Sequence, residues 1–330
     1  MSPASRHAHA TRRAALGALG AGLLAPQAWA ERPYPAHMIS LVLPFAPGGV
    51  ADLTARQVGQ AMGRRLQQSI IVDNRPGAGG IVATHNVVMA APDGYTLLLL
   101  SNANAVSVHL FKKLPYDVTR QLLPITTLGF FDLAIVVPAE SRFKTLPDLL
   151  NTARAQPGKL TVGTISIGST QHLAAELFKS RTGTDMAVVP YKGTPALLNA
   201  LRSGEVDLGF EILSPLLPQL DAKVMRALAV TGPQRFSLLP EVPTAKELGV
   251  ADYVVQSWNA LAAPAGTPAP LLETLRQAAV AALAEPELRD RLTHMGVRPQ
   301  SSTPAELGQL LQQEIQHWGE VVRRAGIKPE

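Results

Sequence analysis

The chain has 330 residues, of which 46% are hydrophobic and 17% charged, with a formal net charge of +5, 26 Gly, 27 Pro and no Cys. This composition is typical of a globular protein and excludes a disordered chain, a coiled coil or a collagen-like repeat. The lack of cysteine excludes disulfides, zinc–thiolate sites, iron–sulfur clusters and a thiol nucleophile. At about 100–200 residues per domain, the length predicts two domains.

Residues 1–30 have the pattern of an export signal peptide. A basic stretch ends in Arg12 and Arg13, an apolar run of about 11 residues follows over 14–24, and Ala28-Trp29-Ala30 supplies the small residues that signal peptidase needs. A membrane-spanning helix needs about 20 residues, so the run is too short for an anchor. The paired arginines leave the general and the twin-arginine export routes both open. The alternative interpretation is a disordered N-terminus.

Loss of this segment changes the charge of the chain. The segment carries Arg6, Arg12 and Arg13 and no acid, so the formal net charge falls from +5 to +2. The remaining sequence has no basic run and gives no case for nucleic-acid binding. It also has no further apolar segment long enough to span a membrane. We therefore expect a soluble periplasmic protein.

In chain order, the first half repeats one pattern of a short apolar strand, a Gly- or Ser-rich turn and an amphipathic helix. The predicted strands, each followed by its turn, are residues 39–45 with 46–49, 70–73 with 76–80, and 96–100 with 101–104. One face of the first helix carries the apolar residues Val50, Leu53, Val58, Met62 and Leu66. The second helix is expected to run to Ala91.

The pattern restarts in the second half of the chain. The predicted strands are residues 133–137, 160–165, 187–189, 206–210 and 226–230, with turns at 168–170 and 191–194. Strands that alternate with helices indicate an α/β fold in which a mostly parallel sheet is flanked by helices on both faces.

The C-terminal part is predicted to be helical. Leu271, Leu272, Leu275, Ala279 and Leu283 have helical spacing, and Thr303-Pro304-Ala305-Glu306 is a capping box with proline at the first helical position. No strands are predicted there, so this tail has no core of its own and is expected to pack on the first α/β unit.

That placement divides the mature chain into two lobes. Lobe 1 would comprise residues 31–131 and 259–330, and lobe 2 residues 132–258. The chain would cross between them near residues 128–133 and 257–261, which predicts a two-lobed clamp with a cleft.

Most signatures of catalysis and cofactor binding are absent. The six histidines of residues 31–330 lie more than four residues apart, which excludes a helical two-histidine metal site. Gly77-Ala78-Gly79 begins like a dinucleotide fingerprint, but Val82 stands where the third glycine belongs. Neither a phosphate-binding loop nor a Gly-x-Ser-x-Gly elbow occurs. We predict no metal, no cofactor and no enzymatic activity.

One pair leaves an enzymatic alternative open. Ser169 and His172 lie three residues apart and could serve as nucleophile and base of a hydrolase in the cleft. The sequence indicates no third residue to orient them. The competing interpretation is that Ser169 caps a helix and His172 lies in its first turn.

The strand-to-helix turns are the candidate binding elements. Ligands of α/β sheets bind beyond the carboxyl ends of strands, where helix N-termini present free N–H groups and a positive dipole end. Suitable glycines and hydroxyls occur at Gly48, Gly49, Gly79, Gly80, Gly168, Ser169, Gly193 and Thr194, with Lys192 the only cationic side chain. Several such starts around one cleft could hold a carboxylate with micromolar affinity, about −8 kcal/mol. For any single turn, the local need for glycine and helix caps is the better explanation.

Two acids have open roles. Asp52 either stabilises the first turn of its helix through the dipole or accepts a bond from a ligand or an ordered water. Glu211, after the strand predicted over 206–210, either selects an amine or hydroxyl of the ligand or bonds the opposite lobe.

Nine motifs in order resemble the Bug-type receptors, the extracytoplasmic solute-binding proteins of tripartite tricarboxylate transporters. The first is Pro44-Phe45-Ala46-Pro47-Gly48-Gly49-Val50-Ala51-Asp52, followed by Ala55-Arg56. The others are NRPGAGG at 74–80, PDGYT at 92–96, LPYD at 114–117 with PI at 124–125, GSTQHLA at 168–174, VPYKG at 189–193, GEVD at 204–207, LPEVPT at 239–244 and APAGTP at 263–268. The resemblance covers essentially all of the mature chain.

This resemblance implies a two-lobed, type II-like periplasmic binding fold that closes on a small carboxylate, partly through ordered water. It implies that turns 44–52 and 168–170 hold the carboxylate from opposite lobes, and that turns 101–104 and 192–194 complete the pocket. The expected ligand-binding residues are Phe45, Pro47, Gly48, Gly49, Asp52, Ser101, Asn102, Asn104, Gly168, Ser169, Thr170, Lys192, Gly193, Thr194 and Glu211.

The sequence departs from the family pattern at three places. Val50 and Ala51 stand where a hydroxyl residue is common, Arg120-Gln121 replaces a Lys-Asp pair, and Glu211 replaces a different small or polar residue. The ligand therefore cannot be transferred from relatives, and dicarboxylates, tricarboxylates, aromatic acids and amino acids all remain open.

The expected function is that of a monomeric periplasmic receptor. It would deliver a small organic carboxylate to the membrane subunits of a tripartite tricarboxylate-type transporter or, alternatively, to a sensor kinase. The hydrolase that uses Ser169 and His172 is the rival from another functional class.

Overall fold

The computed structural model describes residues 34–329, which belong almost entirely to the second of two units of the chain, Pro35–Glu330. The predicted signal peptide, residues 1–30, thus lies outside the described residues. Within residues 34–329, no helix combines the length and the apolar character that crossing a bilayer would need. The described helices and strands belong to this second unit.

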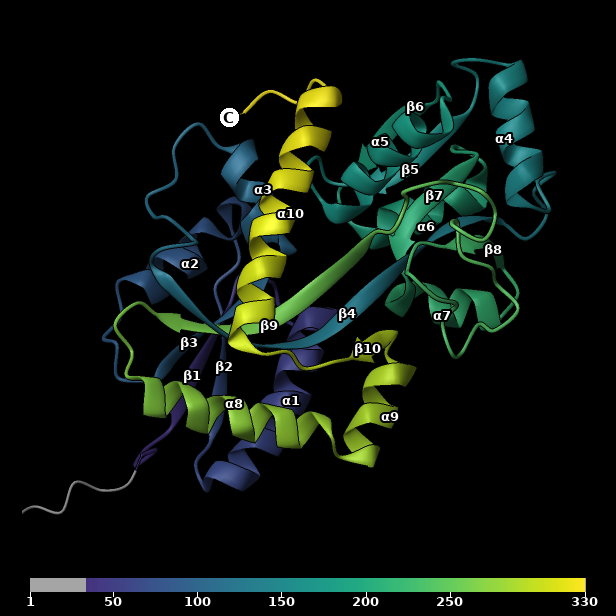
Figure 1. The fold of residues 1–330 in the computed structure, drawn as a ribbon. Coiled ribbons are helices and arrows are strands. Elements are labelled where there is room, and N and C mark those ends of the chain that lie inside the picture. Colours follow the sequence, from purple (N-terminus) through teal and green to yellow (C-terminus); the bar gives the residue numbers. More distant parts are fainter. Residues whose placement is uncertain (1–33, 330) are drawn as a thin grey trace, which may run out of the picture. The chain divides into compact units, whose positions relative to one another are not determined.

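Strands and helices alternate along this unit (Figure 1). The first stretch contains β1 (Ile39–Leu43), α1 (Val50–Leu66), β2 (Ile70–Asn74), the 3₁₀ turn η1 (Ala78–Gly80), α2 (Ile81–Val88), β3 (Thr96–Ser101) and α3 (Asn102–Leu110). The middle contains β4 (Leu122–Pro138), α4 (Leu146–Ala155), β5 (Thr161–Ile165), α5 (Thr170–Thr182), β6 (Ala187–Tyr191), α6 (Thr194–Ser203), β7 (Leu208–Ile212), α7 (Leu213–Asp221) and β8 (Met225–Val230). The last stretch contains β9 (Gln256–Pro264), α8 (Ala269–Leu283), α9 (Pro286–His294), β10 (Val297–Pro299) and α10 (Pro304–Arg324).

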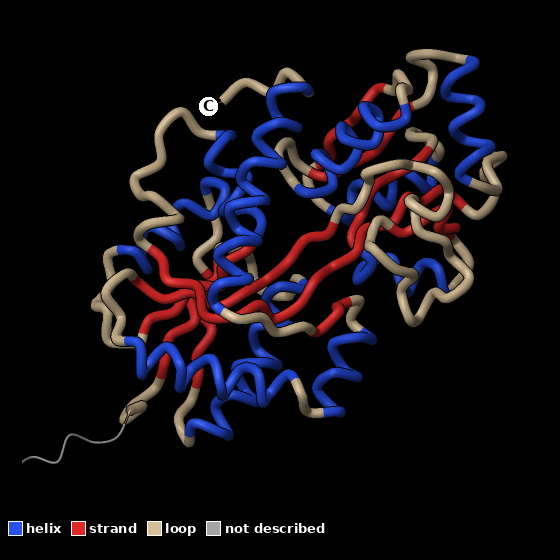
Figure 2. The backbone as a smooth tube through the Cα atoms, viewed as in Figure 1, coloured by secondary structure: helices blue, strands red, loops and turns tan. Residues whose placement is uncertain are grey.

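The strands, drawn in red in Figure 2, form one mixed sheet. Their order is β2-β1-β3-β9-β4-β7-β5-β6, with β8 and β10 also paired to β4. The pairs of β1 with β2 and β3, and of β5 with β6 and β7, are parallel, as expected for strands joined through helices. Every other strand pairing that joins the described elements involves β4 or β9 and is antiparallel. The sheet is therefore less parallel than the repeating pattern alone predicts.

The long strand β4 joins two sections of the sheet. Its first part pairs with β9 and β10, and its last part pairs with β7 and β8. Register shifts between Pro124 and Thr126 and between Thr127 and Gly129 let the strand absorb a proline and a glycine. These two residues are strand breakers in sequence, which is why only residues 133–137 of β4 were predicted as strand.

The other predicted strands are confirmed with shifted ends. β7 begins at Leu208 rather than at residue 206, because Asp207 lies in a turn where its carboxylate accepts from the Thr161 N–H at 2.9 Å. Helix α2 ends at Val88 rather than at residue 91. The capping box is confirmed, with Glu306 N–H donating to Thr303 Oγ1 at 3.2 Å.

The tail was predicted to contain no strand, and this prediction is wrong. β10 pairs antiparallel with the part of β4 around Phe130. Three-residue β10 is too short to show an alternating pattern, so nothing in the sequence identified it. The tail helices pack mainly on helices of the first stretch, α8 on α1 and α10 on α3, and both also contact β4. Helix α10 has a smaller contact with α5. The predicted lobe boundaries are not tested by these contacts and stay a prediction.

The buried hydrophobic residues form separate clusters, and a large one includes residues of β3, β4, β9, α5 and α10. Its largest fully buried side chains include Trp258 on β9 and Trp318 on α10, each 1% exposed. Both indole N–H groups donate to the carboxylate of Glu314 on α10, at 3.4 Å and 2.7 Å. This acid thus satisfies the polar edges of the two tryptophans and links the tail helix to the sheet.

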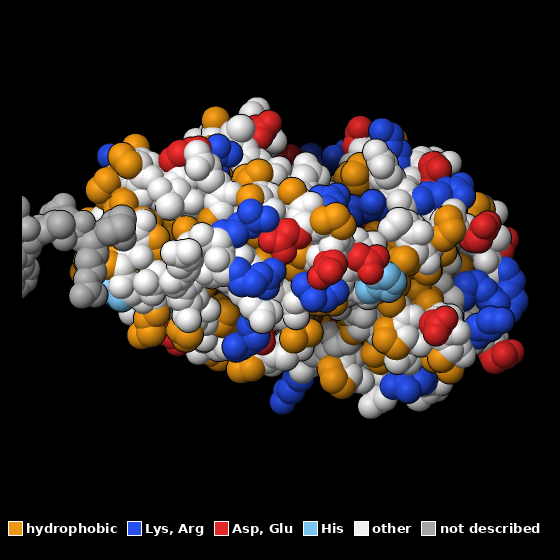
Figure 3. Space-filling model, turned by 90° about the horizontal axis from the view of Figure 1, so that it is seen from below, with side chains coloured by type: hydrophobic (Ala, Val, Ile, Leu, Met, Phe, Trp, Pro, Cys, Tyr) orange, Lys and Arg blue, Asp and Glu red, His pale blue; other side chains and the backbone are white. Residues whose placement is uncertain are grey.

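Charges of both signs are mixed on the surface. In the view from below (Figure 3), Lys and Arg side chains lie beside Asp and Glu and are separated by apolar ones. An example is Glu285 at the start of α9, which pairs with Arg64 and Arg65 of α1 at 2.9 and 3.0 Å. That face, as far as the structure describes it, has no extended field of one sign that would steer a polyanion.

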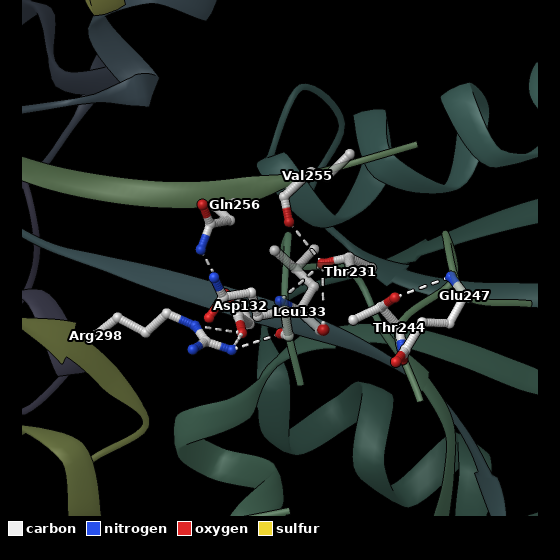
Figure 4. Close-up of polar contacts among 9 residues, drawn as sticks. Asp132, Leu133, Thr231, Thr244, Glu247, Val255, Gln256 and Arg298 are labelled. Carbon is white, nitrogen blue, oxygen red and sulfur yellow. Dashed lines mark hydrogen bonds and ion pairs between the residues drawn. The ribbon is translucent and has the colours of Figure 1, made fainter. Parts of the chain in front are cut away.

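A buried carboxylate fixes the point where β4 and β9 leave one section of the sheet for the other. Asp132 is 0% exposed and accepts from Gln256 Nε2 at 2.6 Å and from Arg298 Nε at 2.8 Å (Figure 4). Arg298, on β10, also donates to the Gln234 carbonyl at 2.8 Å. Gly232 leaves room for this network, since a Cβ there would lie 2.5 Å from the Asp132 carboxylate.

Replacing Arg298 by methionine tests this network. The variant should lose up to about 3 kcal/mol of unfolding free energy, because it leaves a buried carboxylate without its cation. Denaturant unfolding measures the loss. The matched control is Arg235→Met, which removes an exposed pair with Glu247 and should cost much less. Equal losses in the two variants would contradict the assignment.

Candidate functional site

A cavity of about 330 Å³ lies where several predicted turns meet. One wall comes from the end of β1, at Pro44 and Phe45, and from the glycines of residues 77–80. The opposite wall is the segment Ser166–Ser169, between β5 and α5. The cavity thus lies between segments that are far apart in the chain.

Helix α3 supplies the third wall. The residues that face the cavity have the spacing of one helical face and its end: Ala103, Val106, Ser107, Leu110 and Phe111. All but the serine are hydrocarbon. The described residues that line the cavity include no acid, base or amide side chain.

Two glycines allow the walls to approach. Gly168 has φ +78°, and a Cβ there would lie 2.2 Å from Leu110 Cδ1. Gly80 has φ +90°, and a Cβ there would lie 3.1 Å from Pro44 Cβ. The left-handed backbone disfavours any side chain at both positions, and at Gly168 the Leu110 side chain would also have to move, which explains glycine at these two turns.

A buried hydrogen bond joins the starts of α3 and α5. Asn102 Nδ2 donates to Thr170 Oγ1 at 2.5 Å, and Ser257 Oγ of β9 donates to Asn102 Oδ1 at 2.8 Å. Asn102 and Thr170 are 3% and 8% exposed. Two of the predicted binding turns therefore meet directly, beside the cavity.

Ser169 is the cap of α5. Its Oγ accepts from the His172 backbone N–H at 3.1 Å and donates to the Ile165 carbonyl at 2.7 Å. The next N–H groups, of Thr170 and Gln171, have no acceptor inside the helix because they lie in its first turn. The cap thus leaves the positive end of α5 directed at the region of the cavity.

The geometry does not pair Ser169 with His172 as nucleophile and base. The serine hydroxyl proton is directed to Ile165, and Nδ1 of the buried His172 ring has no partner among the described residues. Burial lowers the pKa of His172, and this outweighs the opposite effect of Glu176, so the ring is neutral at pH 7. The arrangement is that of a helix cap and its first turn.

Asp52 organises the turn after β1. Its carboxylate accepts from the Gly48 N–H at 3.0 Å, from Arg56 Nε at 3.0 Å and from Asn74 Nδ2 at 2.9 Å. Burial raises the pKa of Asp52, but the three hydrogen bonds outweigh it and hold the pKa below its usual value. Asn74 also donates to the Phe45 carbonyl at 3.0 Å, so this network sets the position of a cavity wall.

Glu211 on β7 accepts hydrogen bonds from the first turns of α5 and α6 and from the next residue of its own strand. Oε1 accepts from Gln171 Nε2 at 2.6 Å and from the Ile212 N–H at 2.8 Å, and Oε2 accepts from Thr194 Oγ1 at 2.7 Å. The side chain is 0% exposed and does not line the cavity. Burial raises the pKa of Glu211, and these hydrogen bonds offset the effect only in part. The acid fastens the starts of α5 and α6 to β7.

The predicted site residues fall into three groups. Phe45, Gly168 and Ser169 line the cavity. Those that are buried within hydrogen-bond networks behind it are Asp52, Ser101, Asn102, Asn104, Thr170 and Glu211. Outside the cavity lining, in exposed or half-buried turns, are Pro47, Gly48, Gly49, Lys192, Gly193 and Thr194.

Several cavity residues were not predicted. Ile167 is the clearest, a large apolar residue in a Ser-Ile-Gly-Ser turn with 65% of its surface exposed. The sequence does show an isoleucine in an otherwise polar turn, and this pattern could have identified Ile167 as a cavity residue. The cavity face of α3 has the same helical spacing as a face that packs in the core. The sequence therefore does not show whether this face lines a cavity or packs in the core.

Metal binding finds no support in the described residues. Residues 34–329 contain no group of three or more His, Asp or Glu that could hold an ion.

The sequence matches a known family along most of its length. The model of the "Tripartite tricarboxylate transporter family receptor" matches residues 54–327. Protein BugT of Bordetella pertussis is 34% identical over 310 residues, which cover 93% of this chain and 94% of BugT.

Solved structures show the same fold. The periplasmic binding protein BugD has a TM-score of 0.77 at 28% identity, over 90% of this chain and 100% of BugD. R. palustris Rpa4515, solved with adipate, has a TM-score of 0.80 at 32% identity, over 90% of this chain and 100% of its own. MatC from Rhodopseudomonas palustris, solved with bound malate, has a TM-score of 0.74 at 32% identity, over 88% of this chain and 100% of its own. The fold is thus the two-lobed α/β fold of periplasmic binding proteins.

The role of Glu211 predicts that the difference in stability between the Glu211→Gln variant and the unsubstituted protein depends on pH. In Glu211→Gln, the amide oxygen can replace Oε1 as acceptor and the amide N–H can donate to Thr194, so the variant should fold. The folded-state pKa of Glu211 lies above the unfolded value of 4.5. Its stabilising contribution is therefore present below that pH and is lost as the pH rises through the folded-state pKa.

The stability of Glu211→Gln relative to the unsubstituted protein should thus rise from pH 4.5 to pH 8, measured by urea unfolding. Glu211→Leu is the control, because it leaves the Gln171 and Thr194 donors unpaired and should lose about 1–3 kcal/mol. A Gln variant whose relative stability falls with rising pH would contradict the account.

Proposed function

The chain belongs to the tripartite tricarboxylate transporter receptor family, the Bug family, and from this premise we propose that it binds a small organic carboxylate in the periplasm and delivers it to the membrane subunits of a tripartite tricarboxylate-type transporter. The relatives solved with adipate and with malate support a carboxylate ligand. The export pattern of residues 1–30 supports the periplasm. We propose that the receptor works as a monomer and without a cofactor.

The observation that carries the proposal is the meeting of α3 and α5. The Asn102–Thr170 bond brings the starts of these two helices together, and the Ser166–Ser169 wall of the cavity leads into α5. Each helix start offers N–H groups and a positive dipole end. A carboxylate at this place would be held by backbone donors from two segments.

Such a site needs no arginine. A charge–dipole contact contributes about 0.3–1 kcal/mol, or about 2 kcal/mol when partly buried, and a hydrogen bond to a charged group contributes about 1.5–3 kcal/mol. Two helix starts with two or three amide bonds therefore reach the roughly −8 kcal/mol of a micromolar complex.

Closure would couple binding to a change of shape. We propose lobes of residues 31–131 with 259–330 and of residues 132–258, with β4 and β9 as the two crossings. A ligand that contacts Phe45 in one lobe and Ser169 in the other stabilises the closed form, because only that form offers both sets of contacts. Asp132, at the crossing, keeps the strands in register while the lobes move.

Carboxylate binding is tested by thermal shift. Adipate should raise the melting temperature of the protein, by a stabilisation of about 2.7 kcal/mol at one hundred times Kd. Adipamide is the control, since it has the shape of adipate without its charge and should give no shift. If a broad panel of small carboxylates leaves the melting temperature unchanged, the proposed function is wrong.

Gly168→Ala tests the position of the site. The new Cβ would overlap Leu110 Cδ1 and narrow the cavity, so the affinity should fall at least tenfold by isothermal titration calorimetry. Gly183→Ala is the matched control, with φ +62° and no atom within 4 Å of the new Cβ. Both variants carry about 1–3 kcal/mol of backbone strain, but only the first should lose ligand. Equal affinities would place the ligand elsewhere.

A further inference from the structure

We infer that the ligand is a carboxylate with a hydrocarbon body, alkyl or aromatic, and that the cavity discriminates against ligands that carry an ammonium or hydroxyl group on that body. This inference rests on the proposed function. It concerns the residues that surround the hydrocarbon body of the ligand.

The cavity presents mostly hydrocarbon. Phe45, Leu110, Phe111 and Ile167 contribute large apolar side chains from three different segments. Ile167 is 65% exposed, so much of its apolar surface stays in water until an apolar group covers it. A hydrocarbon body in the cavity would remove this surface from water.

Two of the three serine hydroxyls that line the cavity already donate their protons to backbone carbonyls. Ser107 Oγ donates to the Asn104 carbonyl at 3.0 Å, and Ser169 Oγ donates to the Ile165 carbonyl at 2.7 Å. Ser166 is the third hydroxyl and lies at the exposed edge. A hydroxyl on the ligand would therefore exchange water for a wall with few polar partners, which is unfavourable.

An ammonium on the ligand would lack a counter-ion. Glu211 was the predicted acid for this task, but its oxygens accept three hydrogen bonds behind the wall. Asp52 is likewise engaged with Gly48, Arg56 and Asn74. A buried ammonium without an acidic partner is costly, so amino acids should be rejected.

The size of the cavity fits this class. Its volume of about 330 Å³ is at the lower end of the range for small-molecule sites. With the carboxylate near the start of α5, the body of the ligand extends along Ile167, Leu110 and Phe45. Short alkyl and single-ring acids suit this arrangement.

Three matched pairs of probes test the inference by isothermal titration calorimetry: glutarate with glutamate, succinate with malate, and 3-phenylpropanoate with phenylalanine. Within each pair the members differ by one ammonium or one hydroxyl. We expect the hydrocarbon member of every pair that binds to be at least tenfold tighter. The inference is overturned if glutamate, malate or phenylalanine binds as tightly as its partner. If none of the six probes and no other carboxylate binds, the proposed function itself fails.

A variant pair tests the wall directly. Ile167→Ala should weaken the tightest probe about tenfold, because it removes the exposed hydrocarbon that the ligand covers. Ile71→Ala is the matched control: Ile71 is 49% exposed on the edge strand β2 and outside the cavity, and its variant should bind as the unsubstituted protein does. Equal binding by the two variants would overturn the assignment of Ile167.

Discussion

The buried contact of Asn102 with Thr170 and Ser257 is the interaction on which the proposed site depends. It joins the start of α3, the start of α5 and strand β9, which are 68 and 155 residues apart along the chain. Without it, each helix would offer an isolated N-terminus, and an isolated N-terminus is a weak anion site. Two N-termini held together beside one cavity add their dipoles and their amide donors. The side-chain amide thus does its work by positioning backbone groups.

The acids near the site act in the same way. Asp52 and Glu211 both accept several hydrogen bonds from neighbouring loops and helices, and both are buried. Their pKa values shift in opposite directions, because hydrogen bonds outweigh burial at Asp52 and burial outweighs hydrogen bonds at Glu211. The common result is that no carboxylate repels an anionic ligand from within the cavity lining. Structural use of the acids and binding of an anion are therefore compatible.

The sequence predicts those parts of the molecule that depend on local pattern. The strand–turn–helix repeats, the capping box at Thr303 and the cap at Ser169 follow from residue type and spacing. It does not predict β9, β10 or the first part of β4. A three-residue strand such as β10 has no period, and Pro124 and Gly129 on β4 are typical strand breakers until a bulge accommodates them. At the site, the turns could be found, but which turn residues line the cavity depends on long-range packing. Glu211 follows a strand as a ligand-binding acid would, and only its partners Gln171 and Thr194 reveal its structural role.

Family membership and ligand identity are decided by different residues. Relatives at 32% identity share this fold, and their structures contain adipate in one case and malate in another. A shared fold means a shared sheet and shared helix starts, which are backbone features that any carboxylate can use. Whatever separates the ligands must therefore lie in the side chains around the body of the molecule. In this chain large apolar side chains from three segments line the cavity. Under the proposed function, discrimination therefore works through the desolvation of polar groups on the ligand rather than through a paired charge. An apolar wall disfavours an amine or a hydroxyl because neither group finds a hydrogen-bond partner there. The carboxylate is then the one polar group of the ligand that needs hydrogen-bond donors from the site.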